Sequence, residues 1–381
     1  MQYDLIVVGA GVLGAFHAFH AAQMGKKVLL LEKDARQAGS STQNFGQVVP
    51  SGLSEKWNKY GQQSLRTYQD LQIKADFTIR QNGSLYIASD EDEKMLLEEL
   101  SEKHQKIGYY NLLLTKKGVL ERYPDLKPEY VKAGLYYPKE MSVDPQEMVF
   151  RLTEYLHEEG LVHVKYNQKV IECFEKLPGC KIRTEVGDCF TADQVIICCG
   201  YTFETLYPEV FAQSWIQVSK LQMLKTKPLK QFNLHSNILT GLTIRRYESF
   251  SECPSFHHIT VPERYVELRE KGIHILFKQA DDGSIILGDS HEYGGVDDLG
   301  NLGMHSDPII DQMMIKEAQR ILPLPDDCIA ERWAGFYGQH EEDIFIHDVD
   351  KHIKIITGIG GKGMTSASGF AEESIRQLYQ A

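Results

Sequence analysis

One glycine-punctuated segment, between Tyr3 and Asp34, limits the possible fold of this chain more than any other. An apolar run at residues 4–8 ends on Gly9, and a second apolar stretch runs from residue 12 to Met24. A third apolar run, residues 27–31, ends on Glu32. This order predicts a strand, a glycine turn, a helix and a second strand, which together form one βαβ unit.

The turn of this unit has G-x-G-x-x-G spacing, with Gly9, Gly11 and Gly14. In such a turn the first glycine bends the chain, the second lets backbone approach a pyrophosphate, and the third lets helix and strand pack closely. The helix expected from Val12 directs its unpaired N–H groups and positive dipole end at the pyrophosphate. Glu32 is placed to accept a hydrogen bond from a ribose 2′-hydroxyl. The segment therefore predicts an adenine dinucleotide site.

Residues 5–25 are mostly apolar, so a membrane or signal segment is the alternative interpretation. Three glycines, His17 and His20 interrupt the stretch, and Asp4 precedes it without a basic region. These features are not those of a membrane span or a signal peptide. We therefore expect neither.

Charge and cysteine content narrow the choice of partners and compartment. The length of 381 residues suggests about two domains. A net charge of −12 argues against nucleic acid or an anionic membrane as the main partner. Seven cysteines without a C-x-x-C pair fit a reducing cytoplasm. His257 and His258 suggest a metal site, but no third ligand lies at useful spacing, so we expect no metal.

The middle of the chain mixes helices with strands. Asn82-Gly83 predicts a hairpin between residues 77–81 and 84–88. The apolar run 194–199, which ends on Gly200, is typical of a central parallel strand crossed by a ligand. We expect helices at residues 54–74, 89–107, 145–159 and up to 322, strands at 162–166, 169–174, 181–186 and 189–192, and an antiparallel meander within 211–330 that includes 273–279 and 284–288.

A second glycine turn closes the sequence. A strand is expected at residues 352–357 and a helix at 365–379, with Gly358, Gly360 and Gly363 again at G-x-G-x-x-G spacing. Too little chain follows for a second strand with an acid, so this is not a second dinucleotide fold. It is a helix N-terminus with Lys362 beside it, suited to negative charge on a ligand. The alternative is a tight strand-to-helix turn with a solvated Lys362.

The two turns together favour a flavin over a nicotinamide. A nicotinamide enzyme needs one Rossmann turn followed by regular alternation of strands and helices. Here the alternation stops after the second strand, and glycine-ended strands recur near residues 200 and 358. One FAD, extended from the first turn to the closing helix, explains both ends. Lys362 and the N–H groups after Gly361 would stabilise negative charge on a reduced flavin.

Several motifs carry a resemblance to a known family. They are residues 7–14 (VVGAGVLG), 32–33 (EK), 41–46 (STQNFG), 143–145 (VDP), 192–200 (ADQVIICCG), 333–335 (WAG) and 358–365 (GIGGKGMT). In this order they resemble the D-amino-acid oxidase superfamily, in the branch with glycine oxidase and sarcosine oxidase. The resemblance implies an α/β fold with a discontinuous Rossmann-like FAD-binding domain, residues 1–75, 140–210 and 331–381. It also implies an α+β substrate domain with a mixed, largely antiparallel sheet, residues 76–139 and 211–330.

The cofactor residues follow from the two turns together with the resemblance. Ser41 and Thr42 either contact the cofactor or cap a following helix. No cysteine follows Cys328 for covalent attachment, so FAD should be noncovalent. The full predicted cofactor set is Gly9, Gly11, Val12, Leu13, Gly14, Glu32, Lys33, Ser41, Thr42, Asn44, Phe45, Gly46, Val170, Gly200, Gly361, Lys362, Gly363, Met364 and Thr365.

The resemblance implies oxidation of a C–N bond. Hydride would pass from the carbon beside an amine to flavin N5, the imine would hydrolyse, and O2 or another acceptor would reoxidise the flavin. Tyr337 stands where related enzymes carry a carboxylate-binding arginine, so another anchor is needed. Gln47, His291 and Arg246 (or Arg245) are the candidates to hold substrate, and Lys362 and Tyr337 the candidate catalytic residues. Residues 44–46 and 288–291 resemble a subgroup associated with phosphonate breakdown, which adds aminophosphonates to amino acids and N-methyl amines as possible substrates.

Two other functions stay open. The same fold could oxidise 2-hydroxy acids, and the chain could be a dinucleotide-binding protein without catalysis. If the protein oxidises 2-hydroxy acids, only hydroxy acids would bleach its flavin. If it binds a dinucleotide without catalysis, no amine would bleach the flavin.

Overall fold

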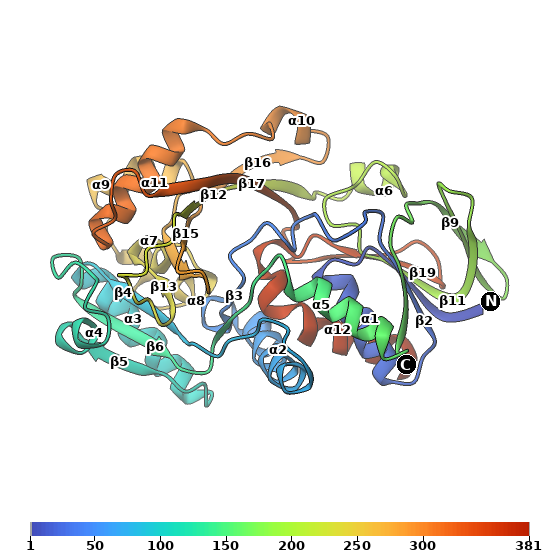
Figure 1. Cartoon of the computed structure of the whole chain (residues 1–381), viewed down its shortest axis with the longest axis horizontal. Coiled ribbons are helices and arrows are strands. Elements are labelled where there is room, and N and C mark those ends of the chain that lie inside the picture. The colour runs from blue at the N-terminus through green and yellow to red at the C-terminus, as the bar shows by residue number, and fades with distance from the viewer. Residues whose placement is uncertain (1, 381) are drawn as a thin grey trace.

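The structure is a computed structural model that describes residues 2–380. It has two lobes, each built on one large β-sheet, and both chain ends lie in the same lobe (Figure 1). The long strands β12 (Gln217–Thr226) and β17 (Ile329–Gln339) pair along their whole length and run from the second lobe toward the first. The predicted class, α/β with a Rossmann-like unit and a second mixed-sheet region, is confirmed.

The first sheet has eight strands with a parallel centre, in the order β18-β19-β11-β1-β2-β8. The predicted βαβ unit forms β1 (Gln2–Val8), α1 (Val12–Gln23) and β2 (Val28–Leu31), and β1 lies between β2 and β11. The other strands are β8 (Val162–Lys165), β9 (Val170–Lys176), β10 (Gly179–Thr184), β11 (Cys189–Ile197), β18 (Phe345–Asp348) and β19 (Ile353–Thr357). Segments from both ends and the middle of the chain therefore share this sheet.

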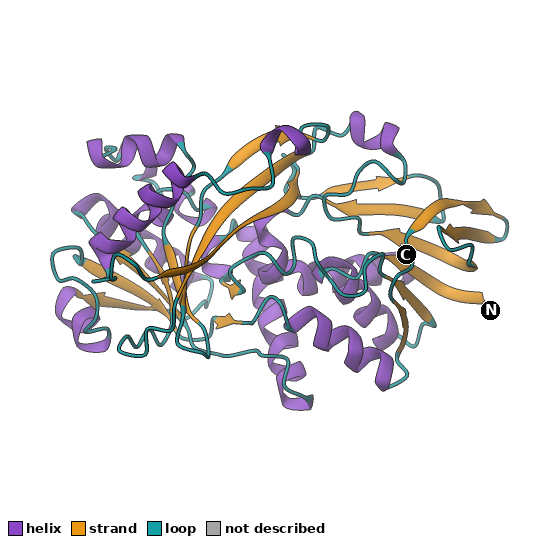
Figure 2. Cartoon of the chain, turned by 45° about the horizontal axis from the view of Figure 1, so that its top comes forward, coloured by secondary structure: helices purple, strands orange, loops and turns teal. Residues whose placement is uncertain are grey.

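Helices cover one face of the first sheet (Figures 1 and 2). They are α1, α2 (Glu55–Lys74), α5 (Met148–Glu158) and α12 (Gly363–Gln380). The closing helix α12 packs on α1 and α2. Gly369 permits the close approach, because a Cβ there would lie 2.2 Å from the carbonyl oxygen of Tyr60. The last helix is thus fixed against the first βαβ unit.

The second sheet has nine strands, in the order β16-β12-β15-β14-β13-β4-β6-β5, with β17 on the other edge of β12. Most of its pairs are antiparallel, and β13 pairs with β4 in parallel. The strands besides β12 and β17 are β4 (Ser84–Ala88), β5 (Leu112–Thr115), β6 (Ala133–Tyr137), β13 (Asn237–Leu239), β14 (Leu276–Gln279), β15 (Ile285–Gly288) and β16 (Glu292–Gly295). The predicted meander through β14 and β15 is confirmed.

Shorter elements complete the molecule. The helices of the second lobe are α3 (Glu91–Lys106), α4 (Lys116–Arg122), α7 (Gly241–Ile244), α8 (Glu248–Ser251), α9 (Glu263–Glu270), α10 (Leu299–Leu302) and α11 (Pro308–Ile321). Helix α6 is Pro208–Ala212, the 3-10 turns are η1 (Pro50–Gly52), η2 (Phe256–His258) and η3 (Gly360–Lys362), and a small two-stranded sheet pairs β3 (Gln47–Val48) with β7 (Met141–Ser142).

The predicted hairpin before β4 is wrong. Residues 77–81 form no strand, and Arg80 instead bridges to Ser142. Strand β4 is buried along its whole length and pairs with β6 on one side and β13 on the other. Gly83 does turn the chain with φ +78°, but long-range partners occupy both edges of β4, so no local partner can pair there. Likewise, the two strands expected at 189–192 and 194–199 form the single strand β11.

We keep the domain limits as a proposal. Strand β17 belongs to the second sheet, although residues 331–339 were assigned to the FAD-binding domain. The outermost residues of that assignment, 1 and 381, lie outside the described residues. The remaining sheet strands between residues 2 and 31, 162 and 197, and 345 and 357 all belong to the first sheet.

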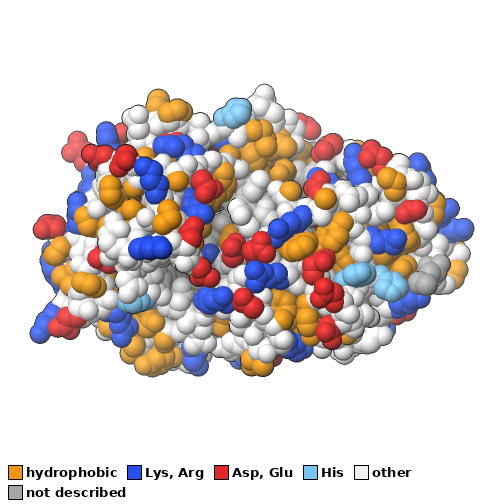
Figure 3. All heavy atoms as spheres, viewed as in Figure 1, with side chains coloured by type: hydrophobic (Ala, Val, Ile, Leu, Met, Phe, Trp, Pro, Cys, Tyr) orange, Lys and Arg blue, Asp and Glu red, His pale blue; other side chains and the backbone are white. Residues whose placement is uncertain are grey.

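Three further features concern the surface charge, the helices and the cysteines. On the face shown in Figure 3, Lys and Arg side chains are interspersed with Asp and Glu side chains. Between residues 2 and 380, no helix combines the length and the apolar character needed to cross a membrane. The seven cysteines are all free thiols in this part of the chain.

Glu140 makes the stability of the fold depend on pH. Its side chain is fully buried, and its Oε1 accepts hydrogen bonds from Ser51 N (2.8 Å) and the Tyr109 hydroxyl (2.7 Å). Burial raises the pKa of Glu140 from 4.5 to about 7, which corresponds to about 3 kcal/mol of unfolding free energy. Because the folded-state pKa is raised, this stability is fully present below pH 4.5 and lost as pH rises through 7.

We expect Glu140→Gln to raise the melting temperature by several degrees at pH 8 and to change it little at pH 5, measured by scanning calorimetry. Glutamine keeps the acceptor oxygen but cannot ionise. The control is Glu98→Gln, at an exposed position on α3, which should leave the melting temperatures at pH 8 and pH 5 unchanged. An equal shift at both pH values would contradict the assignment.

Candidate active site

A cavity of about 880 Å³ runs between the two glycine turns. This volume lies in the upper range of small-molecule sites in proteins. Its lining includes the first turn and Glu32 together with the closing segment, where Gly361, Lys362 and Gly363 contribute. Almost every predicted site residue lines this single cavity; Thr42 is the exception.

The first turn has the tight geometry that its spacing predicted. Gly9 has φ +95°, and a Cβ on it would lie 2.2 Å from the carbonyl oxygen of Cys198 at the end of β11. A Cβ on Gly14 would lie 1.9 Å from the carbonyl oxygen of Gly9. Val12 and Leu13 follow at the start of α1 and also line the cavity. Only glycine fits at both positions, so the turn presents bare backbone to the cavity.

Glu32 lies at the end of β2, as the βαβ pattern requires. Its Oε2 accepts a hydrogen bond from Ala10 N (2.9 Å), and Oε1 accepts one from Asp34 N (3.2 Å). Burial raises the pKa of Glu32, and these two N–H groups partly oppose that rise. Each carboxylate oxygen keeps a second lone pair for a ribose hydroxyl. Lys33 and Val170 line the same end of the cavity.

The loop after β2 is held by its own polar side chains. Ser41 Oγ accepts a hydrogen bond from Val12 N at 2.9 Å, which joins the loop to the start of α1. The Asn44 amide donates to the carbonyls of Ser40 and Ser41, and its oxygen accepts from Gly46 N. Thr42 donates to the Gly39 carbonyl behind the cavity wall. These groups shape the loop, and Ser41, Asn44, Phe45, Gly46 and Gln47 all line the cavity.

The far wall is built from the ends of β11, β17 and β19. Gly200 follows β11 with φ +62° and its carbonyl accepts from the Thr357 hydroxyl at 2.8 Å. Met364 and Thr365 begin α12, and the Thr365 hydroxyl accepts from Val49 N. A Cβ on Gly361 would lie 3.6 Å from the Tyr337 hydroxyl, which places Tyr337 beside the closing turn.

Lys362 is held by two carboxylates. Its Nζ lies 2.7 Å from Glu248 Oε1, on α8 of the second lobe, and 2.8 Å from Asp343 Oδ1, before β18. Burial opposes its charge, but Glu248 and Asp343 more than offset this and raise the pKa of Lys362. Lys362 is therefore positively charged and links the two lobes by ion pairs. The carboxylates of Glu248 and Asp343 partly neutralise the positive charge that a ligand would meet. The solvated alternative does not apply, since its side chain is only 14% exposed.

We expect Lys362→Met to retain FAD but to slow flavin reduction at least tenfold, because a positive charge beside the closing turn is lost. The same change leaves Glu248 and Asp343 without their common cation, so the melting temperature should also fall. The triple variant with Glu248→Gln and Asp343→Asn should recover stability without recovering the rate. Recovery of both in stopped-flow and melting experiments would show that the lysine has only a structural role.

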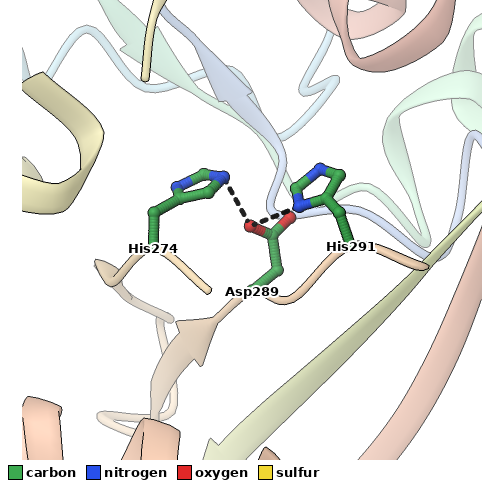
Figure 4. A group of neighbouring side chains, drawn as sticks. All are labelled: His274, Asp289 and His291. Carbon is green, nitrogen blue, oxygen red and sulfur yellow. Dashed lines mark ion pairs between the residues drawn. The ribbon is translucent and has the colours of Figure 1, made fainter. Parts of the chain in front are cut away.

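A buried polar cluster lies in the cavity wall. It consists of His274, before β14, and Asp289 and His291, directly after β15 (Figure 4). The Nε2 of His274 lies 2.8 Å from Asp289 Oδ1, and the Nδ1 of His291 lies 3.9 Å from the same oxygen. Burial opposes the charge of Asp289, but His274, His291 and Arg246 more than offset this and hold its pKa below the ordinary value. Asp289 is therefore an anion in the cavity wall.

His291 is neutral and joined to Tyr337. Its Nδ1 lies 3.2 Å from the carbonyl oxygen of Gly272, which can only accept, so we assign the proton to Nδ1. Its Nε2 then accepts a hydrogen bond from the Tyr337 hydroxyl at 3.0 Å. Burial lowers the pKa of His291 to about 3 and raises that of Tyr337. Both predicted residues thus lie together in the cavity wall.

The two neighbouring arginines have different environments. Arg245 is buried and donates to Glu93 Oε1 (2.6 Å) and Asp90 Oδ2 (2.7 Å), so its charge is used within the second lobe. Arg246 lines the cavity, has an exposed side chain and donates to the Tyr293 hydroxyl at 2.8 Å. Of the two arginines, only Arg246 therefore lines the cavity.

The cavity residues that the sequence did not identify include Asp289, His274 and Glu248. Asp289 had a usable signal, because it directly follows Gly288 at the end of a predicted buried strand and precedes His291 by two positions. His274 and Glu248 had none. Nothing near them in sequence indicates that they face Asp289 and Lys362.

The cavity fits the FAD that the two turns predicted. Gly9, Gly14 and Gly46 line it with bare backbone, because a Cβ at any of them would collide with another backbone atom; on Gly46 it would lie 2.2 Å from the carbonyl oxygen of Val143. Two buried amide oxygens of the lining, Gln37 Oε1 and Gln168 Oε1, have no hydrogen-bond partner within residues 2–380. A polar ligand in the cavity would supply such partners.

The sequence and the fold match known flavoproteins. The sequence profile of the family described as FAD dependent oxidoreductase (DAO) matches residues 4–376. Glycerol 3-phosphate dehydrogenase of Caloramator mitchellensis is 24% identical over 375 residues, which cover 96% of this chain and 72% of that protein.

Two solved structures show the same fold. L-proline dehydrogenase from P. horikoshii has a TM-score of 0.81 at 18% identity, covering 100% of this chain and 94% of the other. Glycine oxidase from Geobacillus kaustophilus has a TM-score of 0.75 at 16% identity, covering 99% and 95%. The fold of these enzymes is thus shared along the whole described chain.

Proposed function

Because this chain belongs to the family of FAD-dependent oxidoreductases, we propose that it oxidises the C–N bond of a small amine that carries an anionic group. The bound flavin would accept hydride from the carbon beside the amine, and O2 or another acceptor would take the electrons onward. An amino acid, an N-methyl amine or an aminophosphonate meets this description.

One observation supports this proposal most directly: the substrate end of the cavity carries opposite charges. Arg246 lines it with an exposed guanidinium, and Asp289 lines it with a buried carboxylate. Each of the two contributes to the pKa shift of the other, so they lie close enough to interact. A zwitterion, with one anionic and one cationic group, complements such a wall. Arg246 would thus take the role of the carboxylate-binding arginine that related enzymes carry at the position of Tyr337.

The remaining polar residues would align the substrate. Gln47 and Tyr337 line the same cavity, and the Tyr337 hydroxyl is held by neutral His291. Hydride transfer needs correct geometry more than a strong base, so fixed side chains of this kind contribute by orientation. The noncovalent cofactor would be held by the predicted residues that line the first turn, the loop after β2 and the closing turn.

A second candidate is oxidation of a small anionic alcohol. Its support is the relative named glycerol 3-phosphate dehydrogenase, which matches 96% of this chain. Arg246 would serve an anionic group in either case.

Anaerobic flavin bleaching tests the proposal. The purified protein, loaded with FAD, is mixed with matched pairs that differ only in amine or hydroxyl: glycine and glycolate, or 2-aminoethylphosphonate and 2-hydroxyethylphosphonate, together with sarcosine, L-proline and glycerol 3-phosphate. We expect an amine to bleach the flavin and its hydroxyl partner to do so far more slowly. Bleaching by alcohols alone would overturn the proposal, and a colourless protein would remove its basis.

A further inference from the structure

The geometry points to Asp289 as the residue that binds the substrate ammonium and thereby selects amines over alcohols. This inference rests on the proposed function and assigns a residue to its specificity. Asp289 is 6% exposed, follows β15 directly, and lines the cavity at the end where Arg246 lies.

The carboxylate is oriented by two imidazoles. His274 and His291 both approach Oδ1, at 2.8 Å and 3.9 Å (Figure 4). The rings of the two histidines stack on each other, with centroids 5.3 Å apart and planes 19° from parallel. This arrangement leaves Oδ2 for a ligand, because no backbone or side-chain group within residues 2–380 donates a hydrogen bond to it.

The groups around Asp289 keep it ionised, although none in direct contact with it carries a permanent charge. The titratable groups that face it are His274, His291, Arg246, Tyr247 and Tyr337, from the segments before β14, after β15, between α7 and α8, and on β17. Of these, only Arg246 is always cationic, and it reaches Tyr293 rather than Asp289 through a hydrogen bond. A substrate ammonium would give the buried carboxylate a direct cationic partner, which a hydroxyl cannot do. Before hydride leaves the neighbouring carbon, one ammonium proton would pass to Oδ2 of Asp289, so that the lone pair of the neutral amine can form the imine.

A metal ion is the other ligand class that this cluster suggests. His274, Asp289 and His291 each offer an atom, and these atoms lie within 4.8 Å of one another. The two nitrogens of His291 are both engaged, however, by Gly272 O and the Tyr337 hydroxyl. Only one histidine and one carboxylate remain, which is fewer than the three protein ligands of catalytic zinc sites. The cluster therefore favours an organic cation over a metal.

The test uses Asp289→Asn, which keeps the shape and an oxygen for His274 but removes the charge. For whichever amine bleaches the wild-type flavin, we expect the concentration needed for half-maximal reduction rate to rise about 10- to 100-fold, as for loss of a charge-assisted hydrogen bond. For the matched hydroxyl compound, the concentration needed for half-maximal reduction rate should rise much less. Asp281→Asn, 88% exposed on the turn between β14 and β15, is the control and should behave like wild type.

A second measurement needs no variant. Compounds without a hydrogen on the reacting carbon cannot be oxidised, so 2-aminoisobutyrate and 2-hydroxyisobutyrate report binding alone. Their inhibition constants against the wild-type enzyme should differ at least tenfold in favour of the amine. Equal inhibition, an unchanged Asp289→Asn variant, or a stoichiometric metal in the purified holoenzyme would each overturn the inference. In all three cases amine oxidation itself could still be observed, whereas a wild type that no amine bleaches refutes the proposed function.

Discussion

Replacing Gly14 by alanine is expected to yield protein without bound flavin. A methyl group at this position would lie 1.9 Å from the carbonyl oxygen of Gly9, within the turn that faces the cavity. Neither atom is the end of a flexible side chain, so α1 must move away from the turn. The helix N–H groups would then no longer converge on a pyrophosphate. We expect FAD affinity to fall more than about 100-fold, measured from the absorbance of purified protein and by titration of the apoprotein.

The control for this variant is Gly25→Ala. Gly25 ends the same helical segment with φ +74°, and nothing lies within 4 Å of a Cβ built on it. The Gly25→Ala variant should lose about 1 kcal/mol of stability, because alanine disfavours the left-handed backbone, and it should keep the yellow colour of bound flavin. If Gly14→Ala retained stoichiometric flavin, the assignment of the first turn to the cofactor would be wrong. Circular dichroism separates loss of flavin from loss of fold.

Arg246→Ala should have the second largest effect, on the substrate rather than the cofactor. Arg246 is an exposed cation of the cavity wall, whereas Arg245 is bound to Glu93 and Asp90. We expect kcat/KM for an anionic amine to fall about 100-fold, equivalent to about 2.7 kcal/mol of transition-state stabilisation. A neutral amine of similar size should be nearly unaffected. Arg246→Lys should recover part of the loss, since lysine keeps the charge but not the planar fork.

The neighbouring arginine provides the contrast. Arg245→Ala would leave the buried Glu93 without its cation, so it should lower the melting temperature while sparing KM. If Arg245→Ala and Arg246→Ala changed KM and melting temperature in the same way, the different environments of the two arginines would not determine their roles. Steady-state kinetics and thermal melting on the same preparations check both statements.

The geometry of the proposed dinucleotide site could be predicted because the residues that define it are close together in sequence. Gly9, Gly11, Gly14 and Glu32 lie on one βαβ unit, so spacing in sequence fixes spacing in space. The closing turn was found in the same way. The hairpin before β4 was wrong for the opposite reason: the partners of β4 come from β6 and β13, far along the chain.

The substrate end depends on such distant contacts throughout. Lys362 was identified, yet its partners Glu248 and Asp343 come from a different lobe and a different loop. Asp289 faces His274, which a hairpin brings beside it. Side chains that meet only through sheet topology leave no spacing signal in one sequence. Residue types could be predicted there, and their pairing could not.

The parallel core of the first sheet has a consequence for biosynthesis. Strand β19 must be made before it can join β11, although β1 and the first turn leave the ribosome more than 300 residues earlier. The nascent chain therefore carries half a cofactor site for most of its synthesis. If the proposed residues hold the flavin, it would bind with full affinity only after α12 docks on α1 and α2, and binding would then stabilise the completed fold by mass action. Cellular flavin supply should thus set how much of this protein accumulates.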